Sequence, residues 1–424
     1  MDKLLDKIFF RSKNLDYISQ NIKDFTDQTP ANKIFKAINS YSEGSEARYV
    51  GGCIRKVIKK ETVDDIDLAT NLNPQQVCKA LHNNNISFYE TGIKHGTITA
   101  VIDDYRFEIT SLREDIDTDG RHAEVKFSTD WKKDASRRDF TINSIYSDLD
   151  GNLFDPFNGK QDLENGDVKF IGDPEKRIKE DYLRILRYVR FFLNYSKKKH
   201  DSETVSIIKR NLNGFSKISS DRLLDEFEKL IRSEGFLKLP KDKDCLEIIN
   251  LIFPQFKNIN IFDNLNNFAK KNFIDMDFVF LLSLMIIDGT DNVDYFIYKF
   301  NISKKDQKRL LFLNTFYSQK ITSKTFTEKN LNKILYYNGR EILMDVVYFN
   351  IFKSKKINNK LIKVITNLKD KILPSVPIKA DVLMSQYNIK KGKELGKKLK
   401  IIEELWVENN FQISEKEVKK IIKN

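Results

Sequence analysis

Two glycines and an arginine are the first residues in this chain that could carry chemistry. Gly51 and Gly52 follow a short strand-like run, and Arg55 comes shortly after them. Glycines after a strand let the backbone approach a ligand closely. If a helix starts there, its free N–H groups and positive dipole end suit a phosphate, and the Arg55 guanidinium adds a forked cation. The alternative interpretation is an ordinary tight turn.

Three carboxylates could hold metal ions beside that turn. Asp65 and Asp67 are two positions apart on a predicted strand, so both project from the same face. This spacing suits one or two Mg²⁺ ions, which would neutralise a triphosphate and lower the pKa of an attacking hydroxyl. Glu108, on a later strand, is the natural third carboxylate. Each residue could be an ordinary surface carboxylate, but together with the glycine turn they favour a nucleotidyltransferase site.

Adjacent arginines followed by an aspartate form a second group, Arg137-Arg138-Asp139-Phe140. The arginines could hold a triphosphate, and the carboxylate could accept a hydrogen bond from a ribose hydroxyl. The composition fits equally well a charged helix start in which Asp139 is the N-cap and Phe140 enters the core. Both interpretations stay open.

A third group lies on a helix predicted over residues 175–193. Asp181 and Arg184 are spaced i and i+3, side by side on one surface, and Arg187 and Arg190 continue the row. A rigid Asp–Arg pair offers both an acceptor and forked donors, as a Watson–Crick base edge demands. The protein could thus select a nucleotide without a nucleic-acid template. On spacing alone, a salt-bridged solvent face is the favoured interpretation.

Length and composition indicate a folded protein of several domains. The chain has 424 residues, of which 40% are hydrophobic, and a net charge of +12. At about 100–200 residues per domain, this length predicts two to four domains. Three cysteines exclude a disulfide framework and a four-thiolate zinc site, and the four histidines contain no H-E-x-x-H motif. Any metal is therefore expected to be a hard cation held by carboxylates.

The predicted elements change in type along the chain. Period-two runs at 96–102 and 105–110, around the turn Asp103-Asp104, predict a hairpin, and residues 74–83 predict a helix. After Asp155-Pro156 the strand signal fades and helical periodicity dominates. The expected fold class is therefore α+β, with a small head containing a mixed or antiparallel sheet followed by a long all-α remainder.

The order of these groups resembles that of a known family. The runs YVGGCIRK, DDIDLAT, FEITSLR, TDGRHAEV, DASRRDFTINSIY and RIKEDYLRILRYVRF are similar to motifs of the class II CCA-adding enzymes (tRNA nucleotidyltransferases) and of the related bacterial poly(A) polymerases. The resemblance extends from about residue 46 to about residue 232 and is visible again in ADVLMSQYNIKKGKELGKKLKIIEELW. It implies an N-terminal helix at 1–30, a nucleotidyltransferase head at 31–150, a nucleotide-selecting helical neck at 151–237, and an all-α, RNA-binding body and tail at 238–424.

The resemblance also implies a role for each motif residue. Asp65 and Asp67 match the metal ligands of the family, and Glu108 matches its third catalytic carboxylate. The implied nucleotide contacts divide into three sets. Those that grip the triphosphate are Gly51, Gly52 and Arg55; those near phosphate and the ribose 2′-hydroxyl are Arg138 and Asp139; those that select the base are Asp181 and Arg184, supported by Glu180 and followed by Arg187 and Arg190.

Two features of the head concern how the motifs are held. Lys56 stands where the family usually has Asp, which leaves open how the first helix is anchored. Residues 115–120, DIDTDG, are similar to a flexible loop whose movement in the family accompanies the change from C to A addition.

Lysines near the C-terminus are the candidate RNA contacts, namely Lys390, Lys391, Lys393, Lys397 and Lys398. Such clusters attract phosphate, although a solvated helix face in a lysine-rich protein is an equal alternative. Aromatic side chains in the helical half are expected to be core rather than base-stacking platforms.

The expected activity is addition of C, C and A to the 3′ end of tRNA from CTP and ATP, dependent on Mg²⁺ and releasing pyrophosphate. The alternatives are a poly(A) polymerase, an enzyme that adds only CC or only A, and a noncatalytic RNA-binding protein. A metal-dependent phosphohydrolase activity is disfavoured. The charges within the first apolar run argue against a signal peptide, so a cytoplasmic location is expected, without membrane association.

Overall fold

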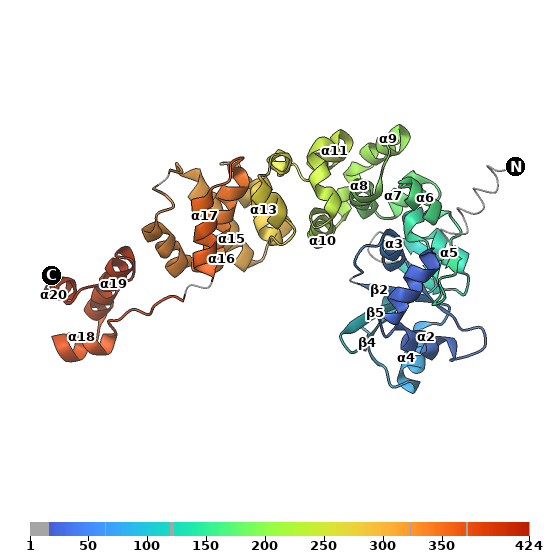
Figure 1. The fold of residues 1–424 in the computed structure, drawn as a ribbon, viewed down its shortest axis with the longest axis horizontal. Coiled ribbons are helices and arrows are strands. Elements are labelled where there is room, and N and C mark those ends of the chain that lie inside the picture. Colours follow the sequence, from blue (N-terminus) through green and yellow to red (C-terminus); the bar gives the residue numbers. More distant parts are fainter. Residues whose placement is uncertain (1–16, 64, 119–122, 323, 370–371, 424) are drawn as a thin grey trace. The chain divides into compact units, whose positions relative to one another are not determined.

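The computed structural model of the chain describes residues 17–63, 65–118, 123–322, 324–369 and 372–423. They divide after Ile252 into two compact units. Described strands occur in the first unit, and the second is helical, which confirms the predicted α+β class (Figure 1). Residues 17–27 are helical, and the rest of the predicted N-terminal helix, residues 1–16, lies outside the described residues.

A seven-stranded mixed sheet forms the centre of the head. Its order is β3-β4-β5-β2-β1-β8-β9, with β2 and β5 parallel and the other neighbours antiparallel. The predicted hairpin is confirmed, because β4 pairs with β5 around a turn in which Asp103 has a φ of 53°. The strands are β1 (Ala47–Val50), β2 (Ile66–Thr70), β3 (Ser87–Tyr89), β4 (Thr97–Ile102), β5 (Tyr105–Ser111), β8 (Tyr146–Ser147) and β9 (Leu153–Phe154).

A separate two-stranded sheet replaces part of the predicted flexible loop. Strands β6 (Arg113–Thr118) and β7 (Ala123–Phe127) pair antiparallel, with a register shift between Asp115 and Asp117. The expectation of a loop over 115–120 is therefore wrong for residues 115–118, where backbone pairing continues as a strand. Residues 119 and 120 lie outside the described residues.

Helices close one face of the large sheet and leave the other for the site. The helix at 17–27, α2 (Ala31–Asn39), α3 (Gly52–Lys59) and α4 (Pro74–Asn83) contribute to the same hydrophobic core as Ile66 and Leu68 of β2 (Figure 1). Because side chains alternate along a strand, Asp67 projects from the opposite face. Helix α3 is anchored in this core by Cys53, Ile54 and Val57, whatever the effect of Lys56.

Short helices complete the head and continue into the neck. Those in the head are α5 (Trp131–Ser136) and η2 (Thr141–Asn143). Those that follow it are α6 (Gly159–Asn165), α7 (Pro174–Glu180), α8 (Leu183–Tyr195), α9 (Ser202–Arg210), η3 (Leu212–Lys217), α10 (Ser220–Ile231), η4 (Glu234–Lys241) and α11 (Lys243–Ile252). Helix α11 packs on η4, which packs on α8. The first unit therefore extends to Ile252, beyond residue 237, where the neck was expected to end.

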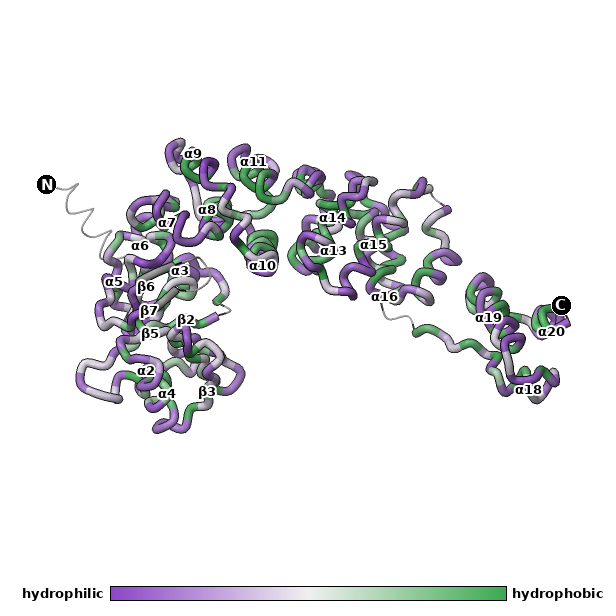
Figure 2. The backbone as a smooth tube through the Cα atoms, turned by 180° about the vertical axis from the view of Figure 1, so that it is seen from behind, coloured by the Kyte–Doolittle hydropathy of each residue, from purple (hydrophilic) through white to green (hydrophobic). Residues whose placement is uncertain are grey.

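The second unit contains helices with mixed hydrophobic and hydrophilic residues along their length (Figure 2). They are η5 (Ile259–Asp263), α12 (Asn267–Asn272), α13 (Phe278–Ile286), α14 (Asn292–Phe300), α15 (Lys304–Ser318), α16 (Glu328–Lys353), α17 (Asn359–Lys369), α18 (Ala380–Tyr387), α19 (Lys393–Glu408) and α20 (Glu415–Lys423). Helix α16 is kinked at Gly339, whose φ is 88°. Within the described residues, helices that combine the length and the apolarity needed to cross a membrane are absent.

Phe140 joins the head to the neck through its ring. The side chain is fully buried and lies 4.7 Å, centroid to centroid, from the ring of Phe170 and 5.4 Å from that of Phe191 on α8. We predict that Phe140→Ala lowers the free energy of unfolding by about 3–5 kcal/mol, because it removes a fully packed ring from this junction. Urea denaturation followed by circular dichroism measures the change.

The control for Phe140→Ala is Tyr89→Ala, on the edge strand β3, where the side chain is 61% exposed. It should change the free energy of unfolding by no more than about 0.5 kcal/mol. Equal effects of the two substitutions would contradict the role given to Phe140.

Candidate active site

A strongly basic cavity of about 450 Å³ lies between the open face of the sheet and helix α8. Seven arginines and three aspartates line it, an excess of positive charge that suits a polyphosphate. It brings together most of the residues singled out in the sequence. The lining is Gly51, Gly52, Arg55, Asp67, Arg137, Arg138, Asp139, Asn143, Asp181, Leu183, Arg184, Arg187, Arg190, Phe191 and Arg222.

The sheet places two of the predicted catalytic carboxylates next to each other. Asp67 of β2 and Glu108 of β5 are direct partners in the parallel register, so their side chains share the open face. Asp65 lies just before β2, is exposed and lines a different pocket. The prediction that Asp65 and Asp67 lie on one strand is therefore wrong, because β2 begins at Ile66. Burial, the charge of Glu108 and the charge of Asp65 raise the pKa of Asp67 to about 6, against the opposing effect of Arg138 and Arg55.

Glu108 and Asp65 therefore both act on the charge of Asp67, and Arg138 and Arg55 offset only part of their effect. The ligand oxygens of the three carboxylates do not all lie within 4.8 Å of one another, so the group is not a closed cage. Hard divalent cations take oxygen ligands and retain several waters, which an open carboxylate edge of this kind allows. The donor chemistry of Asp65, Asp67 and Glu108 therefore fits Mg²⁺.

The glycine turn brings backbone close to these carboxylates. Gly51 has a φ of 68°, a conformation that favours glycine, and α3 begins at Gly52, so the condition set for a phosphate-binding helix start is met. A Cβ atom on Gly51 would lie 3.4 Å from Nη1 of Arg138, and one on Gly52 would lie 3.7 Å from Oδ2 of Asp67. The free N–H groups at the N-terminus of α3 therefore lie next to both Asp67 and Arg138.

Arg55 lines the cavity, and its guanidinium group packs against aromatic rings. Its guanidinium carbon is 4.7 Å from the ring centroid of Phe191, and Nη1 donates to Oδ1 of Asn143. The Nε atom of Arg55 is buried and has no hydrogen-bond partner among the described residues. The ring contact and the bond to Asn143 fix the position of the guanidinium group.

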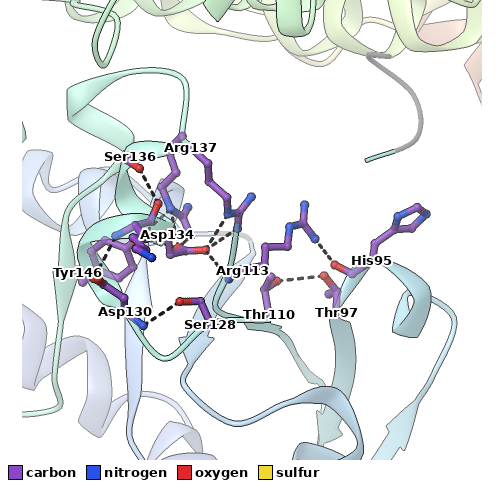
Figure 3. Close-up of polar contacts among 12 residues, drawn as sticks. His95, Thr97, Thr110, Arg113, Ser128, Asp130, Asp134, Ser136, Arg137 and Tyr146 are labelled. Atoms are coloured by element: carbon purple, nitrogen blue, oxygen red, sulfur yellow. Dashed lines mark hydrogen bonds and ion pairs between the residues drawn. The ribbon is translucent and has the colours of Figure 1, made fainter. Parts of the chain in front are cut away.

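Arg138 is held by a buried carboxylate that the sequence analysis did not single out. Asp134, 1% exposed, accepts from Nη2 of Arg138 at 3.2 Å and from Arg137 and Tyr146 (Figure 3). Burial raises the pKa of Asp134, but the guanidinium groups of Arg138 and Arg137 outweigh it and lower that pKa to about 2. Asp134 therefore stays ionised and fixes both arginines.

Asp139 joins the head to α8. It is 7% exposed, and its Oδ2 accepts from Nε of Arg187 at 2.6 Å, while Oδ1 accepts from Nδ2 of Asn143 at 2.8 Å. Burial opposes ionisation, but Arg187 and Asn143 hold the pKa of Asp139 far below its usual range. Asp139 caps no α-helix, so that part of the alternative interpretation is wrong, whereas Phe140 enters the core as that interpretation predicted. The ribose contact of Asp139 stays a prediction.

The predicted helix over 175–193 is interrupted at the residues expected to select the base. Asp181 has φ −153° and ψ 106°, ending α7, and α8 begins at Leu183. Asp181 and Arg184 are therefore not neighbours on one helix face, and this geometric expectation was wrong. The cause is local capping, because the backbone N–H groups of Leu183 and Arg184 donate to Oδ1 and to the carbonyl of Asp181.

Asp181 and Arg184 have separate partners. Oδ2 of Asp181 accepts from Nη2 of Arg222 on α10 at 2.8 Å. Arg184 donates from Nη1 to Glu180 at 2.7 Å and to the carbonyl oxygen of Arg177 at 2.8 Å. Both side chains line the cavity.

Glu226 orders the remaining two arginines of the row. It lies on α10 and is 3% exposed, and its Oε1 accepts from Nε of Arg190 at 2.6 Å. Its Oε2 is 3.7 Å from Nη1 of Arg187. The sequence analysis missed Glu226, although a glutamate among Leu223, Phe227 and Leu230, on the apolar side of an amphipathic helix, is a usable signal.

The lysines near the C-terminus divide into two groups. Lys390, Lys391, Lys393 and Lys397 are exposed. Lys398 is 8% exposed, and its Nζ donates to the carbonyl oxygen of Ile422 at 2.7 Å, at the end of α20. Its inclusion among the RNA contacts is therefore wrong, because it neutralises a helix C-terminus inside the unit.

Several known proteins are similar to this chain in sequence. Residues 47–169 match the family described as the poly A polymerase head domain. The human "CCA tRNA nucleotidyltransferase 1, mitochondrial" is 34% identical over 90% of this chain and 87% of its own length. The "CCA-adding enzyme" of Streptococcus uberis is 28% identical over 87% of this chain and 90% of its own length.

A solved structure supports the fold over the whole length. The CCA-adding enzyme of Bacillus stearothermophilus in complex with CTP superposes with a TM-score of 0.72 at 21% identity, covering 93% of this chain and 96% of that one. The human relative is similar enough, over enough of both chains, to decide the family. The chain belongs to the CCA tRNA nucleotidyltransferases, the CCA-adding enzymes.

Proposed function

We propose that this protein adds C, C and A to the 3′ end of tRNA, using CTP and ATP and releasing pyrophosphate, without a nucleic-acid template. The observation that carries the proposal is the pairing of Asp67 and Glu108 at the edge of a cavity lined by seven arginines. The names of the human and streptococcal relatives support the same activity. The cytoplasmic location stays a prediction, and the human relative is a mitochondrial protein by name.

Asp65 and Asp67 would hold Mg²⁺, with Glu108 as the third carboxylate. Burial and the charge of Glu108 raise the pKa of Asp67, and a bound cation would favour its ionised form. Mg²⁺ at this edge supplies charge neutralisation of the triphosphate and a lower pKa for the attacking 3′-hydroxyl. Glu108 is exposed on β5 and can accept a proton or orient that hydroxyl.

Arginines and backbone would hold the incoming triphosphate. Arg138, fixed by Asp134, lies next to Gly51, and the N-terminus of α3 opens at Gly52. Together they place guanidinium donors and free N–H groups around one point, which preorganises the site for negative charge. The α-phosphorus would then face the carboxylates, with pyrophosphate leaving toward the arginines.

The base would be selected by Asp181 and Arg184. One offers carboxylate oxygens and the other guanidinium donors, and both line the same cavity. Asp181 gives up its contact with Arg222, or shares it, when a base arrives. Lys390, Lys391, Lys393 and Lys397 are the proposed tRNA phosphate contacts of the second unit, because they are exposed and clustered.

The first test of the metal site is Asp67→Ala. We predict that it lowers the single-turnover rate of CTP incorporation at least about 100- to 1,000-fold, because it removes charge needed in the transition state. The control, Glu90→Ala, removes an exposed carboxylate at the other end of the head and should leave the rate unchanged. Normal incorporation by a folded Asp67→Ala protein would remove the metal assignment.

The test of base selection is Arg184→Ala. We predict that kcat/KM for CTP and ATP falls about 10- to 100-fold, the effect of losing charged hydrogen bonds, while discrimination against UTP and GTP narrows. Extension of one tRNA with each nucleotide separately measures both quantities. Lys179→Ala, an exposed residue of α7, is the matched control. Unchanged discrimination by Arg184→Ala would show that other residues read the base.

The extent of addition separates the proposal from its alternatives. On a tRNA that lacks its last three nucleotides, we expect two C residues with CTP alone and a single A after them once ATP is present. Gel analysis at single-nucleotide resolution reads the products. A long A tail on an unrelated RNA would indicate a poly(A) polymerase, and a stop after two C residues with both nucleotides present would indicate a CC-adding enzyme.

A further inference from the structure

Three side chains with nitrogen, oxygen and sulfur donors converge in the neck, away from the proposed active site. They are His200, Asp242 and Cys245, and their ligand atoms all lie within 4.8 Å of one another. Nε2 of His200 is 3.0 Å from Oδ1 of Asp242 and 3.6 Å from Sγ of Cys245. Residues this far apart in sequence meet only because η4 and the start of α11 pack beside α8, so the spacing of the histidines gave no sign of the cluster.

We propose that His200, Asp242 and Cys245 bind a transition-metal ion of the zinc class. In a tetrahedral zinc site with ligands at about 2.0–2.3 Å, two ligand atoms lie about 3.3–3.8 Å apart. The separation of Nε2 and Sγ falls within that range, and the contact between Nε2 and Asp242 is slightly shorter. One imidazole, one thiolate and one carboxylate form a donor set that suits Zn²⁺ and that Mg²⁺ does not prefer.

A hydroxyl group behind the imidazole holds it in a ligating orientation. Nδ1 of His200 is 3.1 Å from Oη of Tyr188 on α8, and the imidazole stacks on Phe192 with a centroid distance of 3.5 Å. A partner on the second ring nitrogen fixes the tautomer and aims the first nitrogen at the metal, as in known metal sites. Nε2 therefore faces Asp242 and Cys245.

One side of the cluster reaches solvent. Cys245 is fully buried and the His200 side chain is 9% exposed, whereas Asp242 is 22% exposed and opens the cluster to solvent. Three protein ligands and one water complete a tetrahedral zinc site. The adjacent carboxylate of Asp201 is engaged elsewhere, accepting from the backbone N–H of Thr204 at 2.9 Å.

A bound ion would clamp the connection between α8 and α9 to the first turn of α11. Binding converts the Cys245 thiol to a thiolate, releases its proton to solvent and involves no redox change. Because the folded protein assembles the ligands from two distant segments, binding should stabilise the first unit. The clamp acts on the helices beside α8 and requires no nucleotide or tRNA.

Cobalt(II) provides the test, because a thiolate ligand gives a charge-transfer band that carboxylate sites lack. EDTA-treated full-length protein should show this band, with intense tetrahedral visible bands, at one equivalent of Co²⁺, and Zn²⁺ should abolish them. Cys245→Ser should lose the charge-transfer band, and Cys78→Ser, which changes a half-buried thiol on α4, should keep it. Added Zn²⁺ should raise the melting temperature of the wild type and of Cys78→Ser but not of Cys245→Ser.

Two further variants change the site more mildly and test it even if Cys245→Ser does not fold. Asp242 accepts from the backbone N–H of Cys245 at 2.9 Å, and Asp242→Asn keeps such a cap while removing the carboxylate. Tyr188→Phe removes only the hydroxyl that holds Nδ1. We expect the first to weaken Co²⁺ binding at least about 10-fold and the second about 10- to 100-fold.

Either of two results would overturn the proposal. Absence of the charge-transfer band in the wild type would leave a metal-free hydrogen-bond network, and unchanged affinity in folded Asp242→Asn and Cys245→Ser proteins would place the metal elsewhere. These readouts do not use nucleotidyl transfer, so the proposed function stands or falls separately.

Discussion

The buried ion pair between Asp139 and Arg187 is the contact on which the arrangement of the cavity depends. It joins the head to α8, and through Asn143 the same carboxylate is linked to Arg55 on α3. A buried charge is tolerable when its oxygens are fully hydrogen-bonded, and Asp139 meets that condition. One carboxylate thereby links α3, the segment at Asn143 and α8 around the cavity.

The other arginines of the cavity follow the same plan. Asp134 holds Arg138, Glu226 holds Arg190, and the carboxylate that accepts from the guanidinium is in each case almost completely buried. Asp134 and Glu226 therefore orient arginine side chains and do not themselves line the cavity. An array of guanidinium groups fixed before the ligand arrives needs little rearrangement when a phosphate enters, which is the basis of electrostatic preorganisation.

Local pattern predicted the parts of this protein that local forces determine. The hairpin at Asp103 follows from period-two alternation, and the head with its sheet, expected to be mixed or antiparallel, is mixed. The break at Asp181 could not be read from periodicity, because the apolar spacing continues across it and neither Gly nor Pro marks it. Its only sign was a residue type that often begins helices.

The same distinction holds for the site. The types and spacing of the charged residues suggested which ones matter, but not which cations pair with which acids. Glu226 joins the site because α10 packs on α8, and Lys398 is not an RNA contact because it packs against the end of α20. These two pairings are tertiary and cannot be read from local spacing. Asp134 differs, because it pairs with Arg138 at i,i+4, a spacing that is visible in the sequence.

The engagement of Asp181 before any nucleotide arrives has a consequence for fidelity. Its two oxygens accept from Leu183 N–H and from the Arg222 guanidinium, so the carboxylate is held in one orientation with lone pairs still available. In the proposed role, a base that presents an acceptor toward Asp181 leaves two lone pairs facing each other, because a carboxylate has no proton to donate. Asp181 would thus act by rejecting mismatched nucleotides.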